Sequence, residues 1–417
     1  MTGREARRAR VGRAISAKSR TATDPDAPRG PPPQSEWSLR AAVPDVVPAA
    51  RPRLPPADRL LPYLRRIDEA RIYSNWGPLC SELEARLSRY LRLPDGGFTS
   101  AASGTSALIG AVLASAGRAS SARPLAILPA FTFPATASAV ECCGYEPYLV
   151  DIDAETWLLD PERLVSHPAL SRVGLIVPVA AFGRPPCQAP WRMFRDATQI
   201  PVVIDGAATF DRFVDQADPE LGEIPLAMSF HATKCFAVGE GGGVACTDTD
   251  LVLRTAQALN LGFLDTRESR APAINGKLSE YHAAVGLAEL DGWTEKHAAL
   301  RAVVAEYRRL LEQHDLATRL VATPDVSATY VLFSCFDTDE AIHVRNSLSR
   351  SGVGHRLWYE RGLHHHAAFS GAARDDLAVT EAIAPRLIGI PVAPDLPDST
   401  VAYVVDALAQ GVRDARV

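Results

Sequence analysis

Apolar positions along this chain alternate between helical repeats and short continuous runs. Leu79, Leu83, Leu87 and Leu91 recur every fourth residue with charges between them, which predicts an amphipathic helix. Short apolar runs separated by helix-like stretches follow, and we predict strands at 125–128, 148–150, 175–179, 202–204, 226–230 and 244–247. Strands that are apolar throughout are typical of sheets covered on both faces, so the pattern predicts an α/β fold with parallel strands at its centre.

The C-terminal third of the chain has a different pattern. Ala283, Leu287, Leu290 and Trp293 space one long helix, which we expect to continue through 307–311. A smaller α+β unit follows, with strands predicted at 330–336 and 388–392 and helices at 340–348 and 400–412. We therefore predict a large α/β domain over 57–315, which includes the long helix, and a small α+β domain over 316–417.

Residues 1–56 differ in composition from the rest of the chain. Five arginines lie between positions 4 and 13, and ten prolines lie between positions 25 and 56. Such a segment buries too little apolar surface to offset the entropy of ordering it, so we predict a disordered extension. It contains no apolar stretch typical of a secretory signal.

The bulk composition narrows the class of protein. The 417 residues are 47% hydrophobic and 22% charged, with a formal net charge of −5, which is ordinary for a globular protein and gives no reason to expect nucleic-acid binding. No apolar run approaches the roughly 20 residues needed to span a bilayer. The seven cysteines are scattered without metal-ligand spacing, which favours reduced thiols and a cytoplasmic location.

The stretch from Ser229 to Val244 carries the most specific chemistry. Lys234 follows a short apolar run and precedes the glycines at 239 and 241–243, which allow backbone to approach a bulky ligand closely. A lysine amine that is partly desolvated can form a Schiff base with an aldehyde such as pyridoxal phosphate (PLP). An ordinary loop lysine remains the alternative from this stretch alone.

Three further features match what a PLP enzyme needs. Ser103 to Ser106 precede a predicted helix, where amides can bind phosphate, although a plain helix N-cap has the same pattern. Asp205 ends an apolar strand and could face the pyridine nitrogen or cap a helix. Phe133 lies at a strand-to-helix turn and could stack on the cofactor or belong to the core.

Other catalytic patterns are weaker. His364, His365 and His366 are consecutive and therefore point in different directions, and no acidic or cysteine partner stands at ligand spacing, so we predict no metal site. The glycine cluster after Lys234 lacks the phosphate-loop pattern, and the chain has no Gly-x-Ser-x-Gly elbow.

With these pieces in order, residues 58 to 415 resemble the DegT/DnrJ/EryC1/StrS family of sugar aminotransferases. The resemblance is carried by the number and order of short motifs: Asn75-Trp76-Gly77-Pro78, Ser103 to Leu108, Phe131-Thr132-Phe133, Gly144 with 151–153, 177–179 with Phe182-Gly183, Asp205-Gly206-Ala207, 229–243 and 274–284. It implies a fold type I PLP-dependent transferase, with a mostly parallel mixed sheet flanked by helices and a smaller C-terminal domain.

The resemblance also implies a role for individual residues. Lys234 matches the Schiff-base lysine and Asp205 the partner of the pyridine nitrogen. The other matches are Phe133 as the stacking aromatic, Gly104, Thr105, Ser106 and Ser229 at the phosphate, and Asn275, which reaches the cofactor phosphate of a neighbouring subunit. A homodimer with a shared active site is therefore implied.

Two positions depart from the family pattern. Ala208 stands where the family usually has glutamine or histidine near the cofactor hydroxyl, and Ile204 stands where glutamate is common. Lys234 argues against the dehydratase branch of the family, which has histidine at this position.

The motifs are most similar to those of enzymes that aminate C4 of nucleotide-linked 4-keto-6-deoxyhexoses, with glutamate as the expected donor. An enzyme that makes an aromatic amino acid of the aminohydroxybenzoate type, and a regulatory protein without turnover, remain alternatives.

Overall fold

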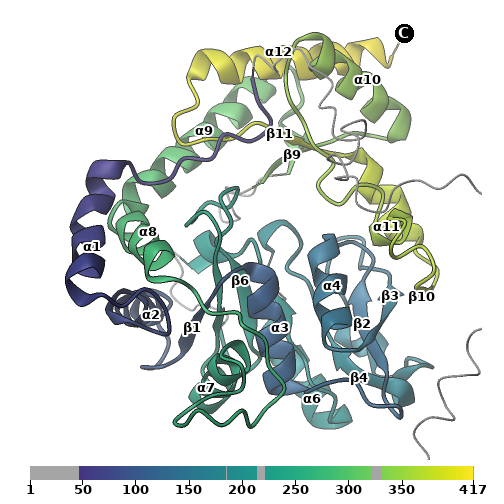
Figure 1. The fold of residues 1–417 in the computed structure, drawn as a ribbon. Helices are drawn as coiled ribbons and strands as arrows, with labels where there is room; N and C mark the ends of the chain where they lie inside the picture. The colour runs from purple at the N-terminus through teal and green to yellow at the C-terminus, as the bar shows by residue number, and fades with distance from the viewer. Residues whose placement is uncertain (1–46, 185, 214–220, 322–329, 417) are drawn as a thin grey trace, which may run out of the picture. The chain divides into compact units, whose positions relative to one another are not determined.

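The computed structural model describes residues 47–184, 186–213, 221–321 and 330–416 (Figure 1). Most of the predicted N-terminal extension, residues 1–46, lies outside the described residues. Residues 47–56 are described, and Val47 forms a parallel bridge with Val353, while the predicted limit at residue 56 stays a prediction. The Val47 amide donates to the Gly352 carbonyl over 3.1 Å, and the Gly354 amide donates to the Val47 carbonyl over 2.7 Å.

Helices make up much of the described chain. They are α1 (Ala57–Ala70), α2 (Pro78–Tyr90), α3 (Gly104–Ser115), α4 (Pro134–Cys142), α5 (Pro161–Leu164), α6 (Gln188–Thr198), α7 (Thr249–Leu259), α8 (Glu280–Asp291), α9 (Trp293–Glu312), α10 (Thr338–Arg350), α11 (Ala378–Ile383) and α12 (Asp398–Asp414). Across the described ranges, no helix is both long enough and apolar enough to pass through a membrane.

The strands form one large and one small assembly. They are β1 (Phe98–Ala101), β2 (Leu125–Pro129), β3 (Glu146–Val150), β4 (Val173–Ile176), β5 (Ile204–Asp205), β6 (Leu226–Ser229), β7 (Gly242–Ala245), β8 (Leu320–Val321), β9 (Val331–Ser334), β10 (Ala373–Arg374) and β11 (Leu387–Ile390). Each run that the sequence analysis assigns to a strand overlaps one of these elements or continues it.

Two four-stranded sheets, ordered β1-β7-β6-β5 and β10-β3-β2-β4, lie edge to edge and together are called the large sheet. Parallel bridges from Ile176 to Val202 and from Val179 to Asp205 connect β4 with the β5 segment. Strand β7 is antiparallel to both of its neighbours, β1 and β6, whereas the other strand pairs of these two sheets are parallel. The predicted α/β fold with parallel strands at its centre is therefore confirmed.

Helices cover both faces of this sheet, and β2 shows why. Leu125 and Ile127 belong to one buried cluster together with Trp191 of α6. Ala126 and Leu128 belong to a second buried cluster together with residues of α3 and α4. Because alternate side chains of a strand point to opposite faces, the continuous apolar run needs a layer of helices on each side.

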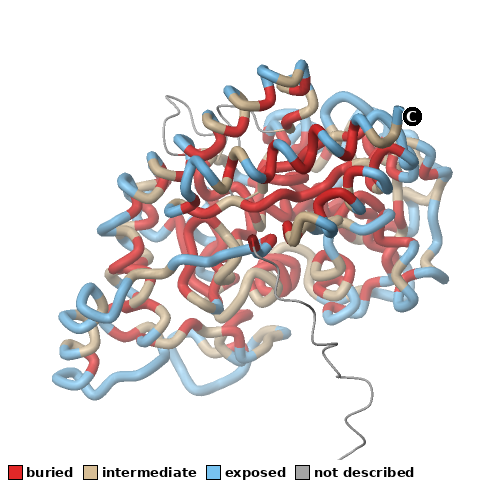
Figure 2. The backbone as a smooth tube through the Cα atoms, turned by 90° about the horizontal axis from the view of Figure 1, so that it is seen from above, coloured by how far each residue is buried: buried red, intermediate tan, exposed pale blue. Residues whose placement is uncertain are grey.

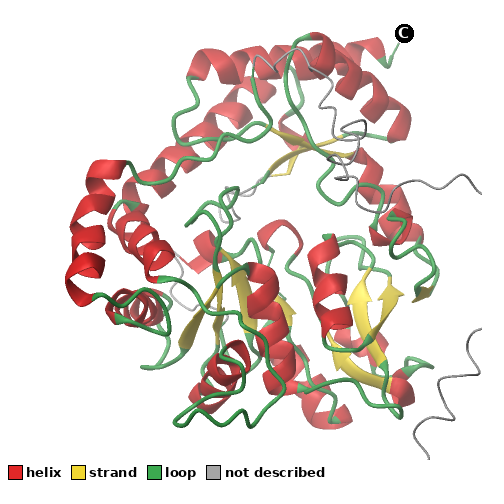
Figure 3. Cartoon of the chain, viewed as in Figure 1, coloured by secondary structure: helices red, strands yellow, loops and turns green. Residues whose placement is uncertain are grey.

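The small α+β unit consists of the antiparallel sheet β11-β9-β8 beneath a layer of helices that includes α10 and α12 (Figure 3). Helices α10 and α12 approach closely because residue 411 is glycine: a Cβ there would lie 2.5 Å from the Val344 Cα. Buried stretches gather towards the inside of the molecule, whereas exposed stretches lie mostly on its outside (Figure 2). The predicted division between residues 315 and 316 stays a prediction.

The prediction of one helix from 283 to 311 is wrong. Helix α8 ends at Asp291 and α9 begins at Trp293, with Gly292 between them as the cap of both. Glycine is among the poorest helix formers, and here it ends one helix with a bond from its amide to the Glu289 carbonyl at 3.2 Å. The apolar spacing continues across the break and therefore conceals it in the sequence.

The close packing of β7 yields the first prediction. A Cβ on Gly243 would lie 2.7 Å from Phe98 Cε1 and 2.7 Å from the Thr99 carbonyl oxygen. We expect Gly243→Ala to lower the free energy of unfolding by about 1–3 kcal/mol, because the buried core cannot move aside freely. Gly371→Ala is the control, since a Cβ there has no atom within 4 Å. Chemical denaturation checks both; equal effects from the two variants would contradict this account.

Candidate active site

A cavity of about 420 Å³ opens where several strands of the large sheet end. Ser103, Phe133, Asp205 and Ser229 lie at or just beyond the carboxyl ends of β1, β2, β5 and β6. Open α/β sheets bind ligands at this edge. Six of the predicted site residues line the cavity: Gly104, Thr105, Phe133, Asp205, Ser229 and Lys234. Two predicted residues, Ser106 and Asn275, are outside its lining.

The start of helix α3 provides a site suited to an anion. The Gly104 and Thr105 amides belong to the first turn of the helix, where amides have no acceptor within the helix. A Cβ on Gly104 would lie 2.6 Å from the Ser229 Cβ and 2.9 Å from its Oγ, so this serine hydroxyl is close to the helix start. Backbone amides together with a hydroxyl are the donors that a phosphate group requires.

Ser106 has a different local role. Its amide donates to the Ser103 Oγ over 3.0 Å, so Ser103 is the N-cap that the sequence analysis considers as the alternative. The capping bond uses the Ser106 amide, which leaves the Gly104 and Thr105 amides without an acceptor within the helix.

The glycines after Lys234 are needed for packing within the protein. A Cβ on Gly242 would lie 2.6 Å from the Met228 carbonyl oxygen and 2.8 Å from the Gly104 nitrogen. The expectation that they make room for a ligand is wrong for Gly242 and Gly243, because protein atoms fill that space. The absence of a side chain at Gly242 lets the start of α3 lie directly against β7, and so it acts on the anion site indirectly.

Asp205 carries a buried carboxyl group at the base of the cavity. Its Oδ2 accepts a hydrogen bond from Thr136 Oγ1 at 2.7 Å, and its Oδ1 accepts one from the Ala207 amide at 3.1 Å. Burial raises the pKa of Asp205 above its usual range, although both hydrogen bonds and the charge of Lys234 oppose the rise. A buried carboxylate of this kind is stabilised by a cation, such as a protonated pyridine nitrogen.

Phe133 presents its ring to the cavity. It is the N-cap residue of α4, and 55% of its surface is exposed, whereas Phe131 two residues earlier is 1% exposed. Phe131 lies edge-on to Tyr359 with ring centroids 5.0 Å apart. The core position that the sequence analysis weighs for Phe133 is therefore occupied by Phe131, and Phe133 is free to stack on a flat ligand.

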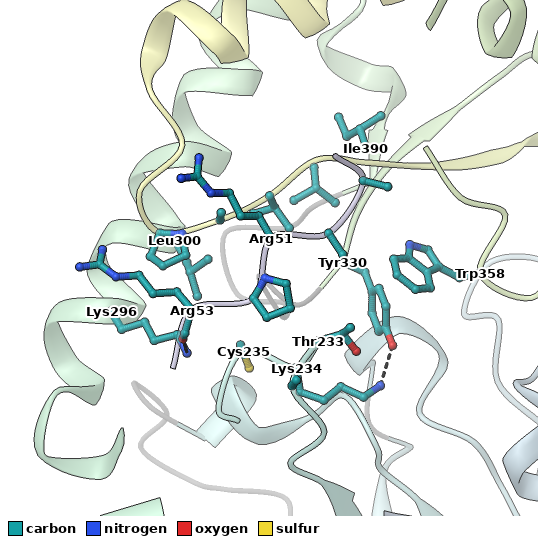
Figure 4. A pocket seen from close by; sticks show the side chains of 18 residues that line it. Arg51, Arg53, Thr233, Lys234, Cys235, Lys296, Leu300, Tyr330, Trp358 and Ile390 are labelled. Atoms are coloured by element: carbon teal, nitrogen blue, oxygen red, sulfur yellow. Dashed lines mark hydrogen bonds between the residues drawn. The ribbon is translucent and has the colours of Figure 1, made fainter. Parts of the chain in front are cut away.

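Lys234 lies on the loop after β6 and extends its amine into the cavity. Its Nζ donates to the Tyr330 Oη over 2.6 Å and lies 4.9 Å from the centre of the Tyr330 ring (Figure 4). Sequence reasoning misses Tyr330, because a tyrosine just before a strand of the small unit carries no motif. It also misses Trp358 and Tyr359, which complete the lining from the same unit.

Ala208 lies inside the cavity lining and Asn275 lies outside it. Ala208 is buried and lines the cavity with a methyl group at the position that departs from the family pattern. Asn275 is exposed, and its Oδ1 accepts a hydrogen bond from Lys277 Nζ at 2.7 Å.

The histidine triplet has an acidic neighbour that the sequence analysis does not find. His364 Nε2 lies 3.3 Å from Glu381 Oε1, and ligand atoms of His364, His365 and Glu381 lie within 4.8 Å of one another. The statement that no acidic partner is near is therefore wrong: Glu381 is 17 residues away in the chain and comes from α11.

These residues fit PLP in the chemistry of their donors. The fold and the site together define an α/β transferase in which a lysine amine, a buried carboxyl group, an exposed aromatic ring and a helix start surround one cavity. The model of the DegT/DnrJ/EryC1/StrS aminotransferase family matches residues 57–409, and the chain belongs to this family. It is thus a PLP-dependent sugar aminotransferase.

The chain is also similar to individual proteins. Protein Rv3402c of Mycobacterium tuberculosis is 33% identical over 373 residues, which cover 87% of this chain and 90% of the relative. The dTDP-4-amino-4,6-dideoxy-D-glucose transaminase of Shigella dysenteriae is 30% identical over 247 residues, which cover 58% of this chain and 64% of the relative. The crystal structure of DesI in the presence of its TDP-sugar product matches with a TM-score of 0.78 and 27% identity, covering 89% of this chain and 94% of DesI.

The buried Asp205 predicts how stability depends on pH. Below the pKa of an unfolded aspartate, about 3.9, the group is protonated in both states and burial costs little. As the pH rises from there through the raised folded-state pKa, ionising Asp205 destabilises the cofactor-free protein, and this cost persists at higher pH. We expect Asp205→Asn to raise the unfolding temperature of the cofactor-free protein at neutral pH, by an amount that shrinks towards about pH 4.

Asparagine can keep the local contacts, since either hydroxyl of the pair Thr132 and Thr136, 2.7 Å apart, can be the donor and the bond to residue 205 can reverse. The measurement is thermal unfolding across pH, with and without PLP. The unsubstituted protein should gain more stability from PLP than the variant does. An unfolding temperature that is the same for both cofactor-free proteins at every pH would contradict the expected cost.

Proposed function

We propose that this enzyme moves an amino group from an amino acid, with L-glutamate as the expected donor, to the keto group of a nucleotide-linked 4-keto-6-deoxyhexose. The observation that carries this proposal is the single cavity shared by Lys234, Asp205, Phe133 and the start of α3. The acceptor class is supported by two relatives, the Shigella transaminase that acts on a dTDP-linked amino sugar and DesI with its TDP-sugar product.

In the proposed reaction, the residues around the cavity have separate roles. When bound, PLP supplies an aldehyde that carries the amino group and a ring that withdraws electrons from the adjacent carbon. In our proposal Lys234 Nζ holds the cofactor covalently and, when free, takes and returns the proton at the reacting carbon. A lysine suits both tasks because its amine is nucleophilic when neutral and basic enough to accept a proton.

The other residues hold the cofactor in place. We propose that Asp205 pairs with the pyridine nitrogen and keeps it protonated, which its buried carboxyl group favours energetically. Phe133 stacks on the ring, while Gly104, Thr105, Ser106 and Ser229 surround the phosphate at the start of α3. Ser106 contributes through the capping arrangement with Ser103, since its amide already donates to the Ser103 hydroxyl.

We further propose a homodimer in which Asn275 reaches the cofactor phosphate of the neighbouring subunit. The exposed position of Asn275, outside the cavity of its own chain, supports this role. None of the seven cysteines is in a disulfide bond, which is compatible with the cytoplasmic location that we expect.

The substrate class is tested with a panel of keto-sugar nucleotides and glutamate. We expect one or more 4-keto-6-deoxyhexose nucleotides to gain an amino group, detected by mass spectrometry, with 2-oxoglutarate formed in equal amount. Conversion of an aromatic precursor alone would favour the aminohydroxybenzoate alternative. Covalent binding of PLP without any response to amino donors would favour the alternative of a regulatory protein without turnover.

The role of Lys234 is tested by chemical trapping. Reduction of the PLP-loaded protein with borohydride should leave the cofactor on the peptide that contains Lys234, and both Lys234→Ala and Lys234→Arg should lose this label and the amino transfer. Arginine keeps the positive charge but not a usable amine, so it separates charge from nucleophilicity. A label on Lys277 or Lys296, or transfer at the normal rate in either variant, would contradict the assignment.

The shared site is tested by mixing two inactive variants. If Asn275 serves the partner's cofactor, a dimer of one Lys234→Ala and one Asn275→Ala subunit has one site with both defects and one intact site. Random mixing should therefore restore about a quarter of the normal activity. Two Lys234→Ala subunits provide the control without recovery. If the mixture stays as inactive as its parents, although mass measurements show mixed dimers, Asn275 acts within its own chain.

A further inference from the structure

The small unit touches the proposed catalytic amine directly. Tyr330 stands immediately before β9, about a hundred residues along the chain from Lys234, and its Oη lies 2.6 Å from the lysine Nζ. Figure 4 shows the lysine side chain extending towards this hydroxyl from the loop below. The amine also lies 4.9 Å from the centre of the tyrosine ring, within the range of a cation–π contact.

The neighbours of Tyr330 fix the position of its ring. Trp358 packs against it at an angle, with centroids 4.9 Å apart, and Phe182 approaches edge-on at 5.6 Å. Trp358 fits here because residue 389 in β11 is glycine; a Cβ there would lie 2.6 Å from the Trp358 Cδ1. A ring held between two aromatic side chains presents its hydroxyl in one place.

Other polar groups near the amine have different partners. The Thr233 hydroxyl lies 2.9 Å from His231 Nδ1, and the Asp205 carboxyl accepts bonds from Thr136 and Ala207. Ala208, which lines the same cavity, offers no polar atom beyond its backbone. The hydroxyl that faces Lys234 Nζ is therefore that of Tyr330.

We propose that Tyr330 is a positioning residue for the Lys234 amine during proton transfer, an inference that rests on the proposed function. A phenol hydroxyl accepts a hydrogen bond from a protonated amine and donates one to a neutral amine, so it can hold Nζ in place before and after a proton moves. The bond to the protonated amine is the stronger of the two. The contact also makes the placement of Lys234 depend on the small unit.

The test is Tyr330→Phe, which keeps the ring and its packing but removes the hydroxyl. We expect PLP still to label the Lys234 peptide after reduction. The rate of the half-reaction with glutamate at saturation should fall by about tenfold, the effect of losing one hydrogen bond of about 1.4 kcal/mol, with little change in KM. We also expect the pH profile of this half-reaction to change, because the hydroxyl contacts the amine that takes and returns the proton.

Tyr403→Phe is the matched control. Its hydroxyl donates to the Ser351 carbonyl over 2.8 Å, and the residue is exposed and outside the cavity lining. This variant should keep the normal rate and pH profile. Thermal unfolding of both variants shows whether either substitution alters folding.

The outcomes separate this inference from the proposed function. If the unsubstituted protein does not label at Lys234 or transfer amino groups, the proposed function fails. If it does both and Tyr330→Phe retains the normal saturated rate and pH profile, the positioning role is overturned. A variant that changes KM and unfolding temperature, with an unmoved pH profile, also overturns it, because a structural role alone gives that result.

Discussion

A carboxyl group held almost out of water at the end of a central strand is the constraint on which the site depends. Asp205 can remain ionised in this position only if the surrounding groups compensate for lost hydration. Thr136 and the Ala207 amide supply most of that compensation, and the nearby Lys234 charge adds a smaller part. The first turn of α4 after β2 and the loops after β5 and β6 must therefore converge on one point, which the parallel arrangement of these three strands makes possible.

The same edge of the sheet gathers groups with opposite electrical character. The start of α3 offers amides to an anion, whereas the buried carboxyl of Asp205 favours a cation. PLP has both an anionic phosphate and a ring nitrogen that can be protonated, so it matches this arrangement. The glycine at 242 makes the arrangement compact, because it lets the helix start lie against β7.

The pattern of apolar residues predicts some parts of the fold and conceals others. The apolar runs predict the strands of the large sheet, since burial on two faces leaves a clear signal in sequence. They cannot show the break at Gly292, because the spacing of apolar residues continues across it. Nor can they show Glu381 beside His364, since a contact across 17 residues depends on how α11 folds back.

The sequence by itself determined the α/β class and, through ordered motifs, which side chains to examine: Lys234, Asp205, Phe133 and the residues at the start of α3. Such residues carry a local signal because each follows a strand or begins a helix. Only the tertiary structure decided that Phe131 takes the core position and Phe133 the exposed one, and that Tyr330 meets the Lys234 amine. Exposure and long-range contact depend on how separate elements pack together, and a one-dimensional pattern does not contain that information.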